Sequence, residues 1–401
     1  MRICQVGTGF TSIPPQVSAA TEEVVYNLCK GLIPLGCDVH IIDVLDKKRL
    51  ATDLPIYEVP YFSFLRTTKS NSPGLIARRL SFSFFSAIKL QRLKHDFDVV
   101  HFHNQFPASM FQFFAKLSFN RVPTVYTLHN PIWGLPYREM PRNAQIKFAL
   151  EVEVMNSVNK VIAVSETLKK NVIERLNLKP SSIIVIPNGV DVDLFHPSRA
   201  SPTLRKKLVA KGEKIILCVG RICRYKGQKV LIDAVPKITQ ENPNVKFVFV
   251  GPMDDSEYLK DILHTIDSKS LGKYCVFTGN VPSNLIPKYF AIADVFVLPS
   301  ITEGLPLTLL QAMSSGRAIV ASAIPQNMEV AKQGDEIIFV NPHNVEEMSS
   351  AIAQLLGDEG KRKKLGEKAR RTALRYFDWK IIAEKTLQLY ENMTGDLSLR
   401  I

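Results

Sequence analysis

Short apolar runs of strand length alternate along the whole chain with segments whose apolar residues recur at helical spacing. This alternation predicts an α/β protein with parallel sheets. The first predicted helix covers residues 22–36 and ends at Gly36. The predicted strands of the first half are 2–9, 38–44, 97–103, 123–129, 160–165 and 183–189. Those of the second half are 214–221, 245–251, 274–280, 293–300 and 317–323.

The alternation is interrupted once, and the chain of 401 residues is long enough for two domains. After residues 188–197 comes a polar, basic stretch with Pro197 and Pro202, which we interpret as a linker. Each half is predicted to be a doubly wound, Rossmann-like domain, the first covering 1–195 and the second 196–378. FDVVHFH (97–103) and ADVFVLP (293–299) share an Asp-Val opening, which is the strongest indication of duplication.

The composition is ordinary for a globular protein, with 46% hydrophobic and 22% charged residues, which excludes disordered, collagen-like and coiled-coil classes. No apolar stretch approaches the roughly 20 residues of a transmembrane helix. The N-terminus has no signal-peptide pattern either, so we expect a cytoplasmic protein. None of the six cysteines forms a C-x-x-C pair, and we interpret them as buried reduced thiols.

A basic segment rich in aromatic residues accounts for part of the net charge of +13. Between Glu58 and Asp96 there is no acidic residue. The segment 59–94 instead carries Arg66, Lys69, Arg78, Arg79, Lys89, Arg92 and Lys94, interleaved with Tyr61, Phe62, Phe64, Phe82, Phe84 and Phe85. Such a segment suits an anionic lipid surface better than nucleic acid. The alternative is a solvated helix with an ordinary core-facing stripe.

Ligands of open parallel sheets bind beyond the carboxyl ends of the strands, so residues just after each strand are the candidates for chemistry. The most informative stretch is SITEGLPLTLLQAMSSG (300–316), with Glu303 and Gly304 in its loop. Pro306 suits the first turn of a helix whose free N–H groups can bind an anion. Gln311 lies about 12 Å further along if the segment is helical, close to the span from a sugar across a diphosphate to a ribose. Alone, Glu303 could equally be a helix cap.

Two basic residues follow the first strand of the second half. Arg221 comes directly after the strand, and Lys226 and Gly227 stand at the entrance of the next helix. Two cations beside a helix N-terminus can neutralise a leaving diphosphate. Arg224 fits a surface charge better. In the first half, Gly7-Thr8-Gly9 offers a further backbone anion site, but it lacks the third glycine of a dinucleotide fingerprint.

Polar side chains also gather at the ends of adjacent strands in the first half: His101, His103, Asn104, His129 and Asn130. A single histidine at a strand end can be a structural residue, but several on one rim predict a polar pocket. No carboxylate with ligand spacing accompanies them, so contacts with sugar and acceptor hydroxyls are favoured over a metal site. His129 is the best single candidate.

These motifs together resemble the retaining, nucleotide-sugar-dependent glycosyltransferases of the GT-B fold, glycosyltransferase family 4. The matching pieces follow the family's order over nearly the whole chain. They are DVVHFHN (98–104), TLHN (127–130), VIAVSE (161–166), IPNGVDVDLFHP (186–197), VGRICRYKG (219–227), FTGNVP (277–282), PSITEGLPLTLLQAMSSG (299–316) and FDWKIIAEKTLQLYE (377–391). The resemblance implies two Rossmann-like domains facing across a cleft, with 379–401 as a tail helix that returns to the first domain.

The resemblance also implies roles for individual residues. Arg221 and Lys226 match the basic pair that holds the donor diphosphate. Glu303 matches the acidic residue that contacts the transferred sugar, with the backbone of Gly304 and Leu305 beside it.

Further roles are implied outside this group. Val281 falls where the nucleobase edge is held, His129 near the reacting sugar, and Gly9 in the glycine loop that closes on the phosphates. Gln311 stands where the family usually has a second glutamate on the ribose, so we expect weaker or altered nucleotide binding. Ala19-Ala20 replace a frequent glycine pair, which would reshape the acceptor side.

The sequence thus predicts an enzyme that moves a hexose from a UDP- or GDP-linked donor to a hydroxyl acceptor, with retained anomeric configuration. The basic segment 59–94 makes a lipid-linked or envelope glycan the expected acceptor. No metal or other cofactor is expected. The alternatives are a nucleotide-sugar-binding protein with weakened or lost catalysis, a nucleotide-sugar epimerase and a sugar-phosphate phosphorylase. The missing third glycine disfavours a dehydrogenase.

Overall fold

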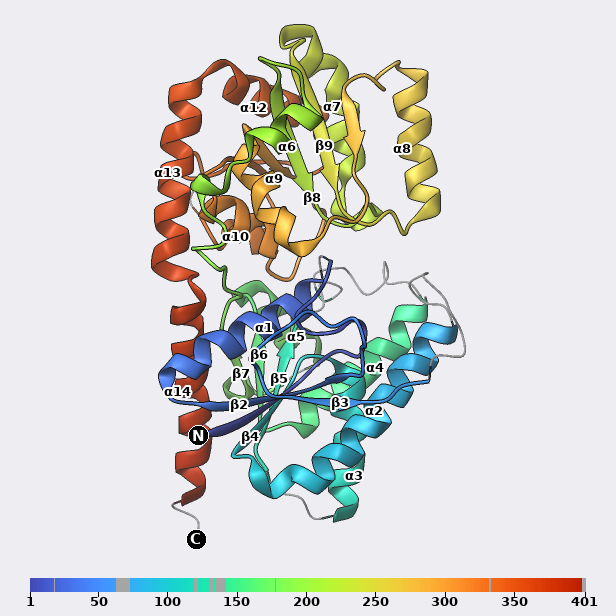
Figure 1. The fold of residues 1–401 in the computed structure, drawn as a ribbon, viewed down its shortest axis with the longest axis vertical. Coiled ribbons are helices and arrows are strands. Elements are labelled where there is room, and N and C mark those ends of the chain that lie inside the picture. Colours follow the sequence, from blue (N-terminus) through green and yellow to red (C-terminus); the bar gives the residue numbers. More distant parts are fainter. Residues whose placement is uncertain are drawn as a thin grey trace. The chain divides into compact units, whose positions relative to one another are not determined.

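The computed structural model describes residues 1–17, 19–62, 73–118, 122–129, 133, 142–176, 178–331 and 333–398. These residues form two compact units, which are described separately below (Figure 1). The first unit comprises Met1–Gly189 together with Trp379–Ile401, and the second comprises Val190–Asp378. The division falls after Gly189, ahead of residue 195, at which the sequence suggested a boundary. The C-terminal segment belongs to the first unit.

The first unit is built on a seven-stranded parallel sheet in the order β3-β2-β1-β4-β5-β6-β7. Its strands are β1 (Arg2–Val6), β2 (Asp38–Val44), β3 (Ile56–Val59), β4 (Val99–Phe102), β5 (Thr124–Leu128), β6 (Lys160–Ala163) and β7 (Ile183–Val185). Its helices are α1 (Ala20–Leu32), α2 (Pro73–Leu93), α3 (Gln105–Ser118), α4 (Arg142–Ser157), α5 (Glu166–Leu176) and α14 (Trp379–Ser398). The described residues of β1, β4 and β5 are buried almost throughout, as expected for strands covered on both faces.

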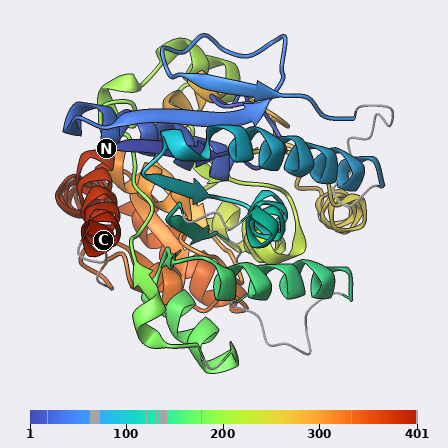
Figure 2. The ribbon, with the colours of Figure 1, turned by 90° about the horizontal axis from the view of Figure 1, so that it is seen from below.

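Helices cover both faces of this sheet. The helix α1 packs against α14, whereas α2, α3 and α4 pack side by side. Right-handed crossovers place these two groups on opposite faces, and Figure 2 shows α14 on the other side of the strands from α2–α4. The helix predicted for 22–36 is shorter than expected. It ends at Leu32 and passes into a 3₁₀ turn, because Pro34 has no N–H to continue the ladder, and Gly36 then closes it with a left-handed φ of 83°.

The second unit repeats this design with six parallel strands in the order β10-β9-β8-β11-β12-β13. Its strands are β8 (Lys214–Val219), β9 (Val245–Val250), β10 (Cys275–Phe277), β11 (Val295–Leu298), β12 (Ala318–Ser322) and β13 (Ile338–Val340). Its helices are α6 (Pro202–Leu208), α7 (Gln228–Glu241), α8 (Ser256–Ser268), α9 (Ile286–Ile292), α10 (Leu307–Ser314), α11 (Pro325–Met328), α12 (Val345–Gly357) and α13 (Glu359–Tyr376). Its main core packs α7, α8 and α12 onto the sheet. The two Asp-Val strands, β4 and β11, each lie next to the first strand of their own sheet.

The interpretation of the stretch around Pro197 and Pro202 as a linker is wrong. Pro197 begins a 3₁₀ turn, and Pro202 begins α6, where the Ser201 hydroxyl accepts a hydrogen bond from the Leu204 N–H. Proline's fixed φ suits a first helical turn, and its missing N–H would have no helical partner there. Several predicted strands are also too long at their carboxyl ends, because the added glycines and polar residues belong to the following loops.

Two other predictions from composition can be compared with the structure. The six cysteines are free thiols, five of them buried, whereas Cys275 is half-buried. No helix among the described residues is both long and apolar enough to cross a membrane.

Candidate active site

In the second unit, the loop after β8 brings two cations to the carboxyl edge of the sheet. The Arg221 guanidinium Nη1 lies 3.5 Å from Asp254 Oδ2. Lys226 ends a 3₁₀ turn and is followed by Gly227, which has a left-handed φ of 67°. A Cβ at Gly227 would lie 2.0 Å from the carbonyl oxygen of Pro299, so a glycine is required where this loop meets the end of β11.

The loop after β11 places Glu303 against Lys226. Lys226 Nζ lies 2.6 Å from Glu303 Oε1, and the Ser300 hydroxyl donates to the same oxygen at 2.6 Å. The Glu303 side chain is only 6% exposed, so the ammonium compensates a largely desolvated carboxylate. The Ile301 N–H also donates to the Tyr225 carbonyl oxygen at 2.8 Å, which ties the two loops together. Residues 77 positions apart in sequence thus form one charged centre.

The other predicted residues of the second unit lie at or near the same edge. Gly304 and Leu305 are buried directly after Glu303, and α10 follows from Leu307 with Pro306 at its N-cap. Gln311 is buried within α10, and Val281 is buried in the segment after β10. Because all strands of the sheet are parallel, the loops after β8, β10 and β11 begin at the same edge of the sheet. An edge with two cations and a buried carboxylate can hold a diphosphate and orient hydroxyl groups.

Sequence reasoning missed Asp254, the partner of the Arg221 guanidinium. Asp254 lies in the loop between β9 and α8. The rule that candidates follow strand ends could have found it, since β9 pairs directly with β8. Its carboxylate holds the guanidinium in place but also competes with any anion for it.

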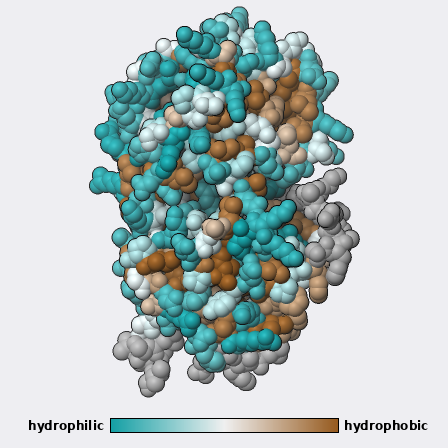
Figure 3. Space-filling model, in the orientation of Figure 1, coloured by the Kyte–Doolittle hydropathy of each residue, from teal (hydrophilic) through white to brown (hydrophobic). Residues whose placement is uncertain are grey.

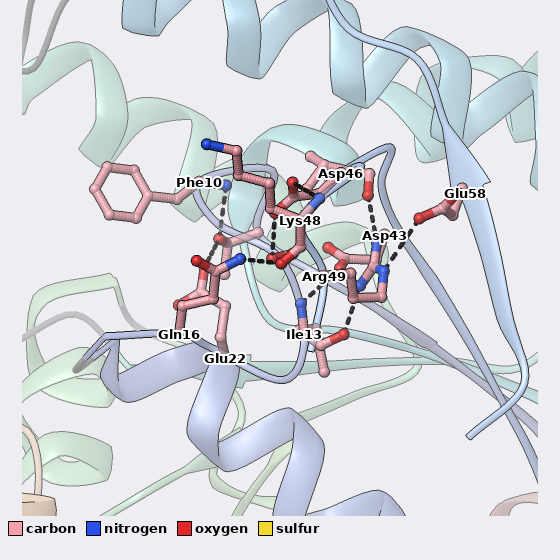
Figure 4. A network of polar contacts seen from close by, with 12 residues as sticks. Phe10, Ile13, Gln16, Glu22, Asp43, Asp46, Lys48, Arg49 and Glu58 are labelled. Atoms are coloured by element: carbon pink, nitrogen blue, oxygen red, sulfur yellow. Dashed lines mark hydrogen bonds and ion pairs between the residues drawn. The ribbon is translucent and has the colours of Figure 1, made fainter. Parts of the chain in front are cut away.

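In the first unit, the Gly7-Thr8-Gly9 loop is organised around a carboxylate of the protein itself (Figure 4). The Thr8 hydroxyl donates to Glu22 Oε1, and the Phe10 N–H donates to the Thr8 hydroxyl at 3.1 Å. Glu22 lies in the first turn of α1 and is 3% exposed, and burial raises the pKa of its carboxyl. The glycine loop that was predicted as a backbone anion site therefore already contacts the Glu22 carboxyl through Thr8.

The same loop is anchored to the end of β2 (Figure 4). The Ile13 N–H donates to Asp43 Oδ2 at 2.7 Å, and Arg49 Nη1 lies 2.6 Å from the same oxygen. Gly9 has a φ of 74°, and a Cβ there would lie 2.4 Å from the Phe82 ring. Its conformation and its packing both require glycine. The sequence did not single out Asp43 or Arg49.

The predicted rim of polar residues in the first unit is partly wrong. His101 and His103 are buried, and each hydrogen-bonds to other side chains of the same unit. Asn104 Oδ1 accepts from the Phe106 N–H at 3.0 Å, at the start of α3. Asn130 lies outside the described residues. His129 is half-buried, and its Nε2 lies 3.1 Å from His103 Nδ1. Desolvation lowers the pKa of His129 to about 4, so its imidazole is neutral at pH 7.

Two family models together match most of the chain. The family model described as Glycosyltransferase Family 4 matches residues 21–194, and the model described as Glycosyl transferases group 1 matches residues 201–372. The chain is 26% identical over 391 residues to the phosphatidylinositol N-acetylglucosaminyltransferase GPI3 subunit of Saccharomyces cerevisiae, covering 96% of this chain and 82% of that protein.

Two solved structures share the fold over almost the whole of both chains. Sucrose-phosphate synthase from Thermosynechococcus elongatus superposes with a TM-score of 0.80 at 20% identity, covering 98% of this chain and 99% of the other. Anabaena HepE, solved in complex with UDP-glucose, gives a TM-score of 0.77 at 20% identity and covers 98% and 100%. At this identity the two structures support the architecture alone.

Proposed function

The chain belongs to the family 4 type of GT-B glycosyltransferases and is a nucleotide-sugar-dependent enzyme. We propose that it transfers a hexose from a UDP- or GDP-linked donor to a hydroxyl acceptor with retained anomeric configuration. One observation carries this proposal. Lys226 and Glu303 form a largely buried ion pair at the carboxyl edge of the second sheet, and Lys226 lies on the loop that also carries Arg221. That arrangement offers cations to a diphosphate and a carboxylate to sugar hydroxyls within one small site.

In the proposed reaction, the bond between the anomeric carbon and the diphosphate oxygen breaks as a bond to the acceptor oxygen forms. The Arg221 guanidinium and the Lys226 ammonium stabilise the charge that develops on the diphosphate. The departing phosphate oxygen takes the proton of the acceptor hydroxyl, which attacks from the same face, so no protein nucleophile is needed. Glu303 accepts hydrogen bonds from hydroxyls of the transferred sugar.

The remaining residues complete the proposed donor and acceptor contacts. Gly304 and Leu305 offer their backbone beside the sugar, Val281 the nucleobase edge, and Gln311 the ribose hydroxyls. From the first unit, His129 contacts a hydroxyl near the reacting carbon.

Thermal-shift titration of the protein with UDP, GDP and ADP, and then with their sugar conjugates, tests the donor site. One nucleotide family is expected to stabilise the protein. Arg221→Ala is expected to weaken that binding by about tenfold to a hundredfold, because a charge-assisted contact is lost. The matched control is Arg224→Ala, since Arg224 is exposed on the same loop and its guanidinium lies 6.0 Å over the Tyr258 ring. Equal losses in both variants would contradict a specific role for Arg221. Binding without transfer would instead favour a protein with lost catalysis.

We also propose that transfer needs no metal ion, because two protein cations already face the proposed diphosphate position. Activity in excess EDTA is expected to stay within about twofold of the untreated enzyme. Complete loss in EDTA, restored by added Mg²⁺ or Mn²⁺, would contradict this assignment of the charge stabilisation to Arg221 and Lys226.

For the acceptor we propose a lipid-linked or envelope glycan, reached from an anionic membrane surface at its inner face. The described part of segment 59–94 supports this. Ile76, Leu80 and Phe84 are spaced four residues apart on α2 and are 44%, 44% and 41% exposed. Phe113 on α3 is 60% exposed. Hydrophobic residues are exposed among polar ones over the surface of this unit, as Figure 3 illustrates for one face. The yeast relative is named for a phosphatidylinositol acceptor.

Vesicle sedimentation tests the membrane proposal. The wild type is expected to sediment with anionic vesicles at low salt, and less with phosphatidylcholine vesicles. Ile76→Ser/Leu80→Ser/Phe84→Ser is expected to lower binding on the order of a hundredfold, since partial burial of each side chain contributes about 1 kcal/mol. Leu263→Ser is the control, because Leu263 is equally exposed, at 43%, on α8 of the other unit. Unchanged sedimentation of the triple variant would refute the role of this stripe.

A further inference from the structure

A chain of buried polar side chains crosses three neighbouring strands of the first unit. Gln5 lies on β1, His101 on β4, and Thr127 on β5, while His103 and His129 directly follow β4 and β5. The three strands are adjacent in the sheet. His101 and His103 are two residues apart, as are Thr127 and His129, so each pair lies on one face of the sheet. Tyr390 of α14 reaches this row from the C-terminal helix and is fully buried.

The hydrogen bonds link Tyr390 to His129 in a fixed order. Gln5 Nε2 donates to the Tyr390 hydroxyl at 3.1 Å, and Gln5 Oε1 lies 2.8 Å from His103 Nε2. His103 Nδ1 then lies 3.1 Å from His129 Nε2. A second arm runs from the Tyr390 hydroxyl to His101 Nδ1 at 2.6 Å and from His101 Nε2 to the Thr127 hydroxyl at 2.6 Å.

With the Gln5 amide oriented as in these contacts, Nε2 toward Tyr390 and Oε1 toward His103, the donors and acceptors of this chain have one consistent assignment. Because Gln5 Oε1 is an acceptor, His103 Nε2 must carry the proton. Burial lowers the pKa of His103 well below its usual value, so the ring is neutral and its Nδ1 can only accept. His129 Nε2 must therefore carry the proton of that ring. On the other arm, the Tyr390 hydroxyl accepts from Gln5 and donates to His101 Nδ1, and His101 Nε2 donates to Thr127.

We propose that Gln5 and Tyr390 are positioning residues that act through His103 to hold His129 in the Nε2–H form, with Nδ1 as the acceptor for a substrate hydroxyl. Tyr390 fixes the orientation of the Gln5 amide, and the amide fixes the tautomer of both histidines in turn. The C-terminal helix thereby sets the chemistry of His129 although it does not touch that residue in these contacts. The link to substrate rests on the proposed role of His129, whereas the tautomer is a property of the protein alone.

The experiment is two-bond ¹H–¹⁵N correlation NMR of histidine side chains at pH 7, with the His129 signals assigned from a His129→Gln spectrum. The wild type is expected to show His129 as the Nε2–H tautomer. In Tyr390→Phe and Gln5→Leu, which release or remove the Gln5 amide, a mixture of tautomers is expected. Thr127→Val is the matched control, because it disrupts the same buried network on the arm that does not lead to His129. The control is expected to retain the single tautomer.

Kinetics extends the test to the reaction. Tyr390→Phe is expected to lower kcat by on the order of tenfold to a hundredfold, with a smaller effect on KM for the donor. An Nδ1–H tautomer in the wild type, or an unchanged tautomer in both Tyr390→Phe and Gln5→Leu, would overturn the proposal. If Tyr390→Phe loses the single His129 tautomer but keeps its kcat, the link between the tautomer and the reaction would be overturned. If the proposed transferase function itself failed, no wild-type turnover would be seen, while the NMR result would still stand.

Discussion

Lys226→Met is expected to lower transfer by a hundredfold to a thousandfold and to destabilise the second unit by about 3–5 kcal/mol. Both effects have the same origin. The substitution removes a cation from the proposed diphosphate contact and leaves the Glu303 carboxylate, 6% exposed, without the ammonium now 2.6 Å away. The Ser300 hydroxyl alone cannot compensate a buried charge. Turnover of the donor identified by titration gives the first effect, and hydrogen exchange in β8 and β11 gives the second.

A double variant separates the two effects. Lys226→Met/Glu303→Gln removes both charges, so most of the lost stability is expected to return while activity stays low. The matched control is Lys229→Met. Lys229 forms a more exposed pair with Asp233 on α7, at 2.7 Å, and its loss is expected to cost less than 1 kcal/mol. A single variant as stable as the wild type would show that the pair does not hold the two loops. Unchanged turnover would refute the role of Lys226.

The site in the second unit could be predicted because it follows from topology. Arg221, Lys226 and Glu303 all lie in loops that follow strands, and parallel strands end at one edge. The sequence could not establish that Lys226 and Glu303 pair with each other. That contact requires β8 and β11 to be neighbours and Gly227 to pack against the Pro299 carbonyl. Lys226 is expected to contact the phosphate and Glu303 the sugar, but in the structure the two side chains are paired with each other. A bound donor must therefore share or rearrange this ion pair.

The first unit was harder to predict, because distant segments decide what its strand ends face. His101 and His103 follow the pattern of residues on an exposed rim. Tyr390 of α14, 289 positions after His101, hydrogen-bonds to His101 directly and reaches His103 through Gln5. The glycine loop likewise suggests an anion site until Glu22 is found beside Thr8. The linker error was local. Ser201-Pro202 is a helix N-terminus signature, and the surrounding basic residues concealed it.

Lowering the pH from 8 to 5 is expected to destabilise the first unit through its buried histidines. Burial lowers the pKa of His101 to about 3 and that of His129 to about 4. In the unfolded chain both titrate near their ordinary value of about 6.5. Between that value and the folded pKa, the unfolded chain binds protons that the folded unit does not. The contribution of each buried histidine to the free energy of unfolding is therefore fully present above about pH 6.5 and is lost as the pH falls. For His101 this loss is about 2 kcal/mol at pH 5.

Buried carboxyls oppose this trend, so the contribution of His101 must be isolated. Burial raises the pKa values of Glu22 and Asp43, which makes the folded unit bind protons more readily and adds stability as the pH falls. The useful quantity is the difference in unfolding free energy between the wild type and His101→Gln, whose amide can replace both hydrogen bonds without titrating. When the pH is lowered from 8 to 5, the wild type is expected to lose about 2 kcal/mol of unfolding free energy relative to His101→Gln.

Tryptophan fluorescence during urea unfolding measures this difference selectively. The chain has two tryptophans, Trp133 and Trp379, and both belong to the first unit. His343→Gln is the control, because it lies in the second unit and should leave the fluorescence transition unchanged. A difference that is the same at pH 8 and pH 5 would mean that His101 titrates alike in the folded and unfolded states. The buried hydrogen bonds from Tyr390 through His101 to Thr127 would then not exclude water from His101.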